Sequence, residues 1–157
     1  MTIGSSLSAQ NLNPKKSELK KIFRKSISQN SRKIVTTDSN PWVIDNTDSI
    51  YFKADTIKLI NIKKQYKYEF CEKINWTFYR NTKFYLGETQ TCREPSSGKA
   101  GNEYNWYSIE FKKTDYGLTL ITSNLSGIVD RFLVISISRN EIKDEIVLKR
   151  ITLKASG

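Results

Sequence analysis

Short runs of alternating apolar and polar residues, separated by turn residues, constrain the fold of this chain more than any other feature. They recur about every 8–12 residues between residues 49 and 153. In one of them, Ile109 and Phe111 alternate with Ser108 and Glu110. Alternation with a period of two is typical of a strand that buries one face. We therefore expect an antiparallel β-sandwich or an up-and-down β-barrel, and we favour the barrel.

The expected strands follow from these runs, which are rich in aromatic and β-branched residues. They cover residues 49–52, 56–62, 66–70, 74–79, 83–86, 104–111, 118–123, 128–138 and 146–153. In the last run the apolar phase slips, which predicts a β-bulge near Lys149 and Arg150. A loop rich in turn residues, 94–102, separates the two halves of the pattern.

The segment before the strands has a different periodicity. Leu19, Ile22, Phe23 and Ile27 recur at helical spacing, with basic residues between them. This spacing predicts a short amphipathic helix over residues 15–28. Our preferred interpretation is a helix that flanks or plugs the barrel. The alternative is a basic helix that lies on a membrane surface.

Positive charge is concentrated in the same segment. Residues 1–40 hold eight lysines and arginines against two acidic residues, a net charge of +6, whereas the whole chain carries +10. We divide the chain into a basic N-terminal segment, 1–40, whose last part (29–40) is a linker, and a β-barrel domain, 41–157. The segment is expected to add little to the stability of the barrel and to dock an acidic protein partner in the cell envelope. The candidate partner-binding residues are Lys15, Lys16, Lys20, Lys21, Arg24 and Lys25. The alternative is that the charge serves solubility alone.

Two cysteines, Cys71 and Cys92, bear on the compartment. An even pair in a small strand-rich domain predicts one disulfide and an oxidising environment. The alternative is two buried free thiols in a cytosolic protein. Residues 5–10 resemble the small-residue tail of a signal peptide, without its charged and apolar regions, and could instead be a flexible terminus. We expect an exported protein (periplasmic, cell-surface or secreted) with no transmembrane segment, because no apolar run approaches about 18 residues.

The chain contains no histidine. This removes the usual general base near neutral pH and the commonest metal ligand. Two cysteines without histidine cannot form an ordinary zinc site, and no glycine-rich phosphate loop occurs. We therefore expect neither an enzyme nor a cofactor.

Basic residues interleaved with aromatic ones raise a weaker alternative. They occur at residues 63–68 and 76–83. A barrel sheet could stack single-stranded nucleic acid bases on Trp76, Tyr79 or Tyr85. The simpler interpretation is the ordinary alternation of a half-buried strand, so nucleic acid is not our expected partner.

A set of residues spread over 50–154 carries a family likeness. The residues are Phe70 and Cys71 before Trp76, Thr77 and Phe78, then Gly87 and Cys92, Trp106 at the start of a strand, Gly-Leu-Thr-Leu at 117–120 and Val-Leu-Lys-Arg at 147–150. In this pattern the chain resembles the bacterial secreted lipocalin-like proteins of the calycin type. The G-x-W of the first lipocalin strand is missing, and only Pro41 and Trp42 lie near its place. The resemblance implies an exported β-barrel with an uncharacterised or apolar ligand.

Aromatic and aliphatic side chains are the candidates for lining such a barrel. The inward-facing candidates are Phe52, Ile57, Leu59, Trp76, Phe78, Tyr107, Phe111, Phe132 and Val134. As ligand-binding residues we single out Trp76, Phe78, Trp106, Tyr107 and Phe132. The alternative is that they fill the core of a small barrel.

From these observations and the resemblance, we expect a non-catalytic, lipocalin-like binding or interaction protein that binds a small apolar ligand or a protein partner. The alternative function is an accessory subunit of a larger cell-envelope assembly, docked by the basic segment.

Overall fold

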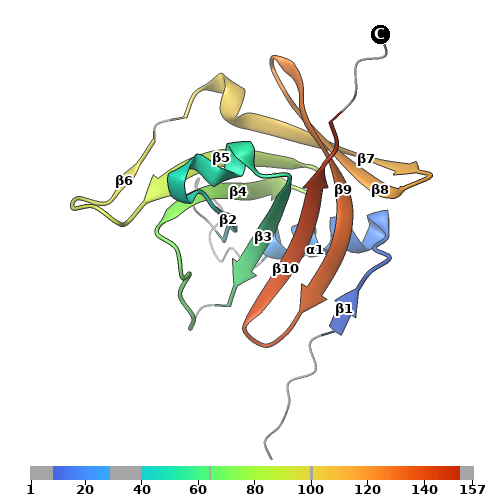
Figure 1. The fold of residues 1–157 in the computed structure, drawn as a ribbon, viewed down its shortest axis with the longest axis horizontal. Helices are drawn as coiled ribbons and strands as arrows, with labels where there is room; N and C mark the ends of the chain where they lie inside the picture. The colour runs from blue at the N-terminus through green and yellow to red at the C-terminus, as the bar shows by residue number, and fades with distance from the viewer. Residues whose placement is uncertain (1–8, 29–39, 64, 100, 153–157) are drawn as a thin grey trace, which may run out of the picture.

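The wall of the molecule is an antiparallel sheet that closes on itself. The computed structural model of the chain (Figure 1) describes residues 9–28, 40–63, 65–99 and 101–152. Eight strands form the wall: β2 (Trp42–Asp45), β3 (Thr56–Ile62), β4 (Glu72–Arg80), β5 (Lys83–Gln90), β7 (Trp106–Thr114), β8 (Gly117–Asn124), β9 (Gly127–Arg139) and β10 (Lys143–Arg150). The expected antiparallel β-barrel with a short N-terminal helix is confirmed.

Shorter elements decorate this wall. They are the strands β1 (Ala9–Asn11), which pairs with β9, and β6 (Ser97–Gly98), which pairs with β5, the helices α1 (Lys16–Ser28) and α2 (Ile50–Lys53), and the 3₁₀ turns η1 (Thr47–Ser49) and η2 (Glu103–Asn105). Residues 5–8 of the signal-like stretch and 29–39 of the expected linker lie outside the described residues.

The strand order follows the chain except at one place. Around the barrel it runs β3-β2-β4-β5-β7-β8-β9-β10, and β10 closes onto β3. Strands β2 and β3 have thus exchanged the positions they would hold in a simple up-and-down barrel. Because β3 and β4 are both antiparallel to β2, the connection 63–71 must run the length of the barrel to join them. The described part of this connection, residues 65–71, lies on the outside of the wall (Figure 1).

The hydroxyl of Tyr68 ties this outer connection to the wall. It accepts a hydrogen bond from the Ile62 amide at 3.2 Å and donates one to the Ile60 carbonyl at 3.2 Å. These contacts lie at and just beyond Ile60, which forms the Val43–Ile60 pair between β2 and β3. The expected strand 66–70 is therefore a strap across the barrel rather than part of its wall.

Helix α1 closes the end of the barrel where β2 begins and β4 ends, which we call the helix end. Leu19, Ile22 and Phe23 are buried in the same hydrophobic core as the barrel strands. The Phe23 ring stacks on Phe78, with centroids 4.1 Å apart, and meets Trp42 edge-on at 5.8 Å. The helix that flanks the barrel is thus confirmed, and its apolar face is not available to a membrane. Contrary to our expectation of a weakly held segment, α1 contributes three side chains to the core.

The opposite end, which we call the rim end, is covered by η1 and α2. We expected a strand at 49–52, but Asp48 and Ser49 adopt positive φ angles of 54° and 60°, and a short helix follows. This turn sends the Tyr51 side chain into the core and leaves Phe52, an expected inward residue, 59% exposed.

Arg150 fastens the cover at the rim end. Its guanidinium donates to the Ala54 carbonyl at 2.6 Å and forms an ion pair with Asp130 at 3.1 Å. It also lies over the rings of Tyr51 and Phe132, 5.3 and 5.4 Å from their centroids. The end of β10, the start of β9 and the end of α2 are thereby joined through one side chain.

The pairing of β10 with β9 contains a bulge, but the prediction placed it on the wrong strand. The register shifts between Val147 and Leu148, because Val147 pairs with Ser136 and Leu148 with Val134. The extra residue, Ile135, is therefore on β9. Along β10, the shift lies two residues before the predicted place.

Candidate functional site

The interior of the barrel is filled by its own side chains. Trp76, Phe78 and Phe132 are buried, and Trp76 stacks on Phe84 with centroids 4.3 Å apart. Tyr107, which is half-buried, stacks on Phe84 from the neighbouring strand β7, with ring centroids 5.1 Å apart. Four of the five ligand-binding candidates thus belong to the core cluster or pack against it.

The fifth candidate, Trp106, lies on the outside. It is 50% exposed, because neighbouring residues of a strand face opposite sides and Tyr107 takes the inner one. Its ring meets Tyr79 and Tyr85 edge-on, with centroids 5.2 and 4.9 Å apart. We call these three residues the outer aromatic cluster. Three residues were considered from the sequence as platforms on which nucleic acid bases could stack. Tyr79 and Tyr85 belong to the outer aromatic cluster, whereas Trp76 is in the core.

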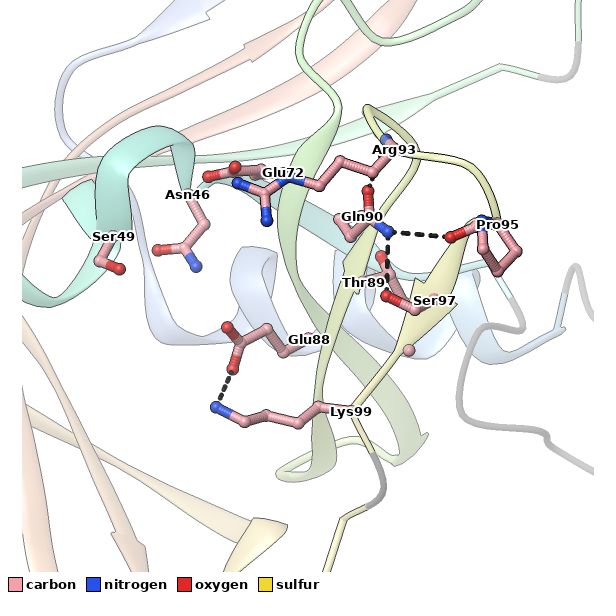
Figure 2. A pocket seen from close by; sticks show the side chains of 11 residues that line it. Asn46, Ser49, Glu72, Glu88, Thr89, Gln90, Arg93, Pro95, Ser97 and Lys99 are labelled. Carbon is pink, nitrogen blue, oxygen red and sulfur yellow. Dashed lines mark hydrogen bonds and ion pairs between the residues drawn. The ribbon is translucent and has the colours of Figure 1, made fainter.

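A pocket of about 650 Å³ opens at the rim end, and we call it the rim pocket (Figure 2). It is lined by Asn46, Ser49, Glu72, Glu88, Thr89, Gln90, Arg93, Pro95, Ser97, Gly98 and Lys99. Most of these side chains are polar or charged. None of them was among the candidates from the sequence, although the loop 94–102 was recognised as a break in the strand pattern.

Four parts of the chain meet around the rim pocket. Asn46 follows β2, Glu72 begins β4, Glu88 lies near the end of β5, and the loop after β5 supplies Arg93.

Cys71 and Cys92 form the predicted disulfide, with Cα atoms 5.3 Å apart, and so join the start of β4 to the loop after β5. The Thr91 amide also donates to the Cys71 carbonyl at 2.9 Å. The loop that carries Arg93 is therefore tied to the wall next to the pocket.

The Gln90 side chain organises the same loop from inside. Its amide nitrogen donates to the Pro95 carbonyl at 3.2 Å and to the Ser97 hydroxyl at 3.0 Å. Its amide oxygen accepts from the backbone N–H of Arg93 at 2.9 Å. Figure 2 shows these bonds along one side of the pocket, with the Arg93 side chain extending from the loop toward Glu72.

Some of the charged side chains that line the rim pocket already have partners within the protein. Glu88 pairs with Lys99 at 3.4 Å. One oxygen of Glu72 accepts from the backbone N–H of Asp48 at 3.2 Å and so supports the left-handed turn there. Among the described residues, Glu72 and Arg93 have no ion-pair partner and do not pair with each other, although both line the pocket.

Asn46 is the most deeply buried polar side chain of the pocket, at 4% exposed. Its backbone N–H donates to the Glu72 carbonyl at 2.9 Å, which holds it at the pocket wall. Its Oδ1 atom has no hydrogen-bond partner within the described chain. A buried acceptor without a partner costs about 1–3 kcal/mol, so a native structure seldom keeps one without a reason.

The basic residues of the N-terminal segment lie on the solvent side of α1. Lys15, Lys16, Lys21, Arg24 and Lys25 are exposed, and Lys20 is half-buried. They oppose the face that α1 presents to the core. Arg24 also borders an open hollow together with Tyr79 and Arg80, next to the outer aromatic cluster.

Comparisons with known proteins identify no relative, since no family model, no curated protein and no solved structure matches the chain. Over the described ranges, no group of three or more metal-ligating side chains is placed to hold an ion. In the same ranges, no helix has the length and apolar character needed to cross a membrane.

Proposed function

We propose that this chain is an exported, non-catalytic, lipocalin-like barrel that binds a small ligand at its rim pocket. The observation that carries the proposal is a pocket of about 650 Å³ with the buried, unpartnered Asn46 amide in its wall. Small-molecule sites usually measure about 300–1,000 Å³. The core packing of Trp76, Phe78 and Phe132 supports a site at the rim, because these rings take the space that an apolar ligand would need inside.

Export is supported by the disulfide and by the signal-like stretch at residues 5–10. Disulfides persist mainly in oxidising compartments, and they are rare in the cytosol. The Cys71–Cys92 bond joins the wall to the pocket-bearing loop, so an oxidised state and an ordered pocket belong together in this proposal.

The absence of histidine supports a binding role without catalysis. The carboxylates of the rim pocket are engaged with a lysine in one case and a backbone amide in the other. Neither arrangement pairs a nucleophile with a general base, which is the usual signature of a catalytic site.

Two other surfaces support alternative functions. The exposed lysines and Arg24 on α1 suit an acidic partner, as an accessory subunit of a cell-envelope assembly would require. The outer aromatic cluster, with Arg24 and Arg80 nearby, suits single-stranded nucleic acid, because bases stack on exposed aromatic rings beside cationic side chains.

The proposal is tested by a thermal-shift screen of the oxidised protein. The panel holds small polar metabolites, saturated fatty acids and an oligothymidine, and the variants are Asn46→Leu at the rim pocket and Trp106→Ala at the outer cluster. A ligand at about 100 times its Kd stabilises a protein by about 2.7 kcal/mol. We expect a polar compound to raise the Tm of wild type and of Trp106→Ala but not of Asn46→Leu.

Other outcomes discriminate between the alternatives. A fatty acid that stabilises wild type and Asn46→Leu equally would place the ligand inside the barrel and contradict the proposal. An oligothymidine shift that weakens with salt and disappears in Trp106→Ala would favour nucleic acid binding instead.

A further inference from the structure

We infer that the rim pocket takes an amino-acid-type zwitterion, a small ligand that carries both an ammonium and a carboxylate group. The inference rests on the proposed function of the rim pocket as a binding site, and it names the ligand class. It follows from two oppositely charged side chains of the lining, Arg93 and Glu72, which have no ion-pair partner among the described residues. It follows also from the Asn46 side-chain oxygen, which has no hydrogen-bond partner.

The positive side of the pocket is Arg93. Its backbone N–H is bonded to Gln90 at 2.9 Å, and the Cys71–Cys92 disulfide ties the neighbouring residue to the wall. The base of the side chain is thus held in place, while its guanidinium extends into the pocket (Figure 2). A guanidinium presents a planar fork of donors that matches a carboxylate in a bidentate way. Arg93 is therefore suited to the carboxylate of the ligand.

The negative side of the pocket is Glu72. One of its oxygens accepts from the Asp48 amide at 3.2 Å, which orients the carboxylate, and a carboxylate has lone pairs for further donors. The other acidic residue in the lining, Glu88, already pairs with Lys99 at 3.4 Å. Glu72 is therefore suited to the ammonium of the ligand.

Asn46 adds a neutral group beside Glu72, since its backbone N–H donates to the Glu72 carbonyl at 2.9 Å. A half-turn of the amide exchanges its oxygen and its nitrogen, and the two positions are nearly equal in shape. The oxygen that now lacks a partner can in this way meet an ammonium donor. The Asn46 amide can thus supply an acceptor for a bound ammonium beside Glu72.

Ligands with a single charge fit the pocket less well. A simple anion at Arg93 would be repelled by Glu72, and a simple amine at Glu72 would be repelled by Arg93. Because the two side chains line one pocket without forming an ion pair in the described chain, a ligand with both charges compensates each of them. Electrostatic complementarity of this kind selects between ligands of similar size.

The experiment is a calorimetric titration of the oxidised full chain with the common amino acids and alanyl-alanine. For the tightest of them, the N-acetyl and the carboxamide derivatives are titrated as well. Each derivative removes one charge, and we expect each to bind about tenfold more weakly or worse, as the loss of a charge-assisted hydrogen bond implies.

Three variants assign these effects to residues. Glu72→Gln keeps an acceptor for the Asp48 amide but removes the charge, so the N-acetyl derivative should then bind about as well as the free amine. Arg93→Gln should do the same for the carboxamide. The control is Lys112→Gln, an exposed lysine of β7 outside the pocket lining, which should change the affinity by less than about twofold.

Two results would overturn the inference. One is that no amino acid or alanyl-alanine binds. The other is that the derivatives bind as tightly as the zwitterion. If an uncharged compound such as a sugar binds instead and Asn46→Leu abolishes its binding, the rim pocket remains the site and only the ligand class is wrong. If no compound depends on Asn46, the proposed function fails as well.

Discussion

The two ends of the barrel are closed by different kinds of interaction. At the helix end, α1 contributes part of the core, and aromatic rings such as Phe23 and Phe78 stack directly. At the rim end, Arg150 holds the end of α2, and a left-handed turn at Asp48 and Ser49 and a disulfide lie next to a polar pocket. The contacts at the helix end are mainly between apolar rings, although the buried indole N–H of Trp42 has no hydrogen-bond partner in the described chain. The rim end retains the unpartnered Asn46 oxygen together with Glu72 and Arg93, two charged side chains without an ion-pair partner among the described residues. This contrast is why we place stability mainly at the helix end and binding at the rim end.

The largest expected effect is at the helix end. Phe23→Ala removes a buried ring that stacks on Phe78 at 4.1 Å, and such a change typically costs about 3–5 kcal/mol. Denaturant unfolding measures the loss. The control is Arg24→Ala, one residue further along α1 but exposed, which should change the free energy of unfolding by less than about 0.5 kcal/mol. A loss below about 1 kcal/mol for Phe23→Ala would show that α1 is held only weakly.

The disulfide provides the next largest effect, at the rim end. A loop of about 20 residues closed by one disulfide is stabilised by roughly 3 kcal/mol in the chain-entropy model. We expect the double variant Cys71→Ala, Cys92→Ala to lose about this amount in chemical unfolding. Thiol labelling of the denatured, unreduced wild type should detect no free sulfhydryl. Labelling of both cysteines in the wild type would contradict the bond and weaken the case for export.

The interactions of Arg150 at the rim end are expected to give the third largest effect on stability. Its ion pair with Asp130 is largely shielded, with side chains 17% and 23% exposed, so Arg150→Met strands a carboxylate and should cost about 2–3 kcal/mol. The control is Lys99→Met, whose 3.4 Å pair with Glu88 is open to solvent, with side chains 76% and 36% exposed. It should cost less than about 1 kcal/mol. Equal losses in the two variants would remove the special role of Arg150 at the rim end.

Alkaline pH tests the cover that α2 places over the core. Burial raises the pKa of the Tyr51 hydroxyl above its ordinary value of about 10. Above pH 10 the unfolded chain therefore releases this proton while the folded barrel keeps it, so the free energy of unfolding falls as the pH rises. Tyr51→Phe should flatten this fall by up to about 1.4 kcal/mol per pH unit. Tyr116→Phe, at an exposed turn, should leave the slope unchanged, and an equal slope in all three proteins would show that Tyr51 ionises freely.

The smallest effect on stability is expected on the outer side of α1. Lys16→Gln with Lys21→Gln alters exposed residues and should change the free energy of unfolding by less than about 0.5 kcal/mol. If this surface docks an acidic partner, recovery of that partner in a native pull-down should fall, and added salt should reduce wild-type recovery in the same way. Recovery that is insensitive to both changes would assign the charge to solubility.

Local patterns in the sequence were sufficient for the parts of the fold that bury one face. Strand β3 was predicted within its observed bounds, and α1 within one residue, because a period of two or of 3.6 is visible in any run that has one apolar face. The pairing of Cys71 with Cys92 followed from there being only two cysteines. Strand β2 was missed because it has only four residues, of which the first three are buried, so it shows no alternation.

The tertiary structure decided what these patterns cannot encode. Residues 49–52 alternate like a strand, but the left-handed turn at Asp48 and Ser49 makes them a helix that covers the core. The rim pocket is assembled from β2, β4, β5 and the following loop, and its residues come from positions 46 to 99.

The sequence by itself thus determined the barrel class, the core-facing helix and the disulfide, since each depends on periodicity or on the identity of a few residues. Only the tertiary structure decided the exchange of β2 and β3, the outward position of Trp106 relative to Tyr79 and Tyr85, and the meeting of Asn46, Glu72 and Arg93. These features depend on which strands become neighbours, and that choice is made by the packing of the whole core rather than by any local run of residues.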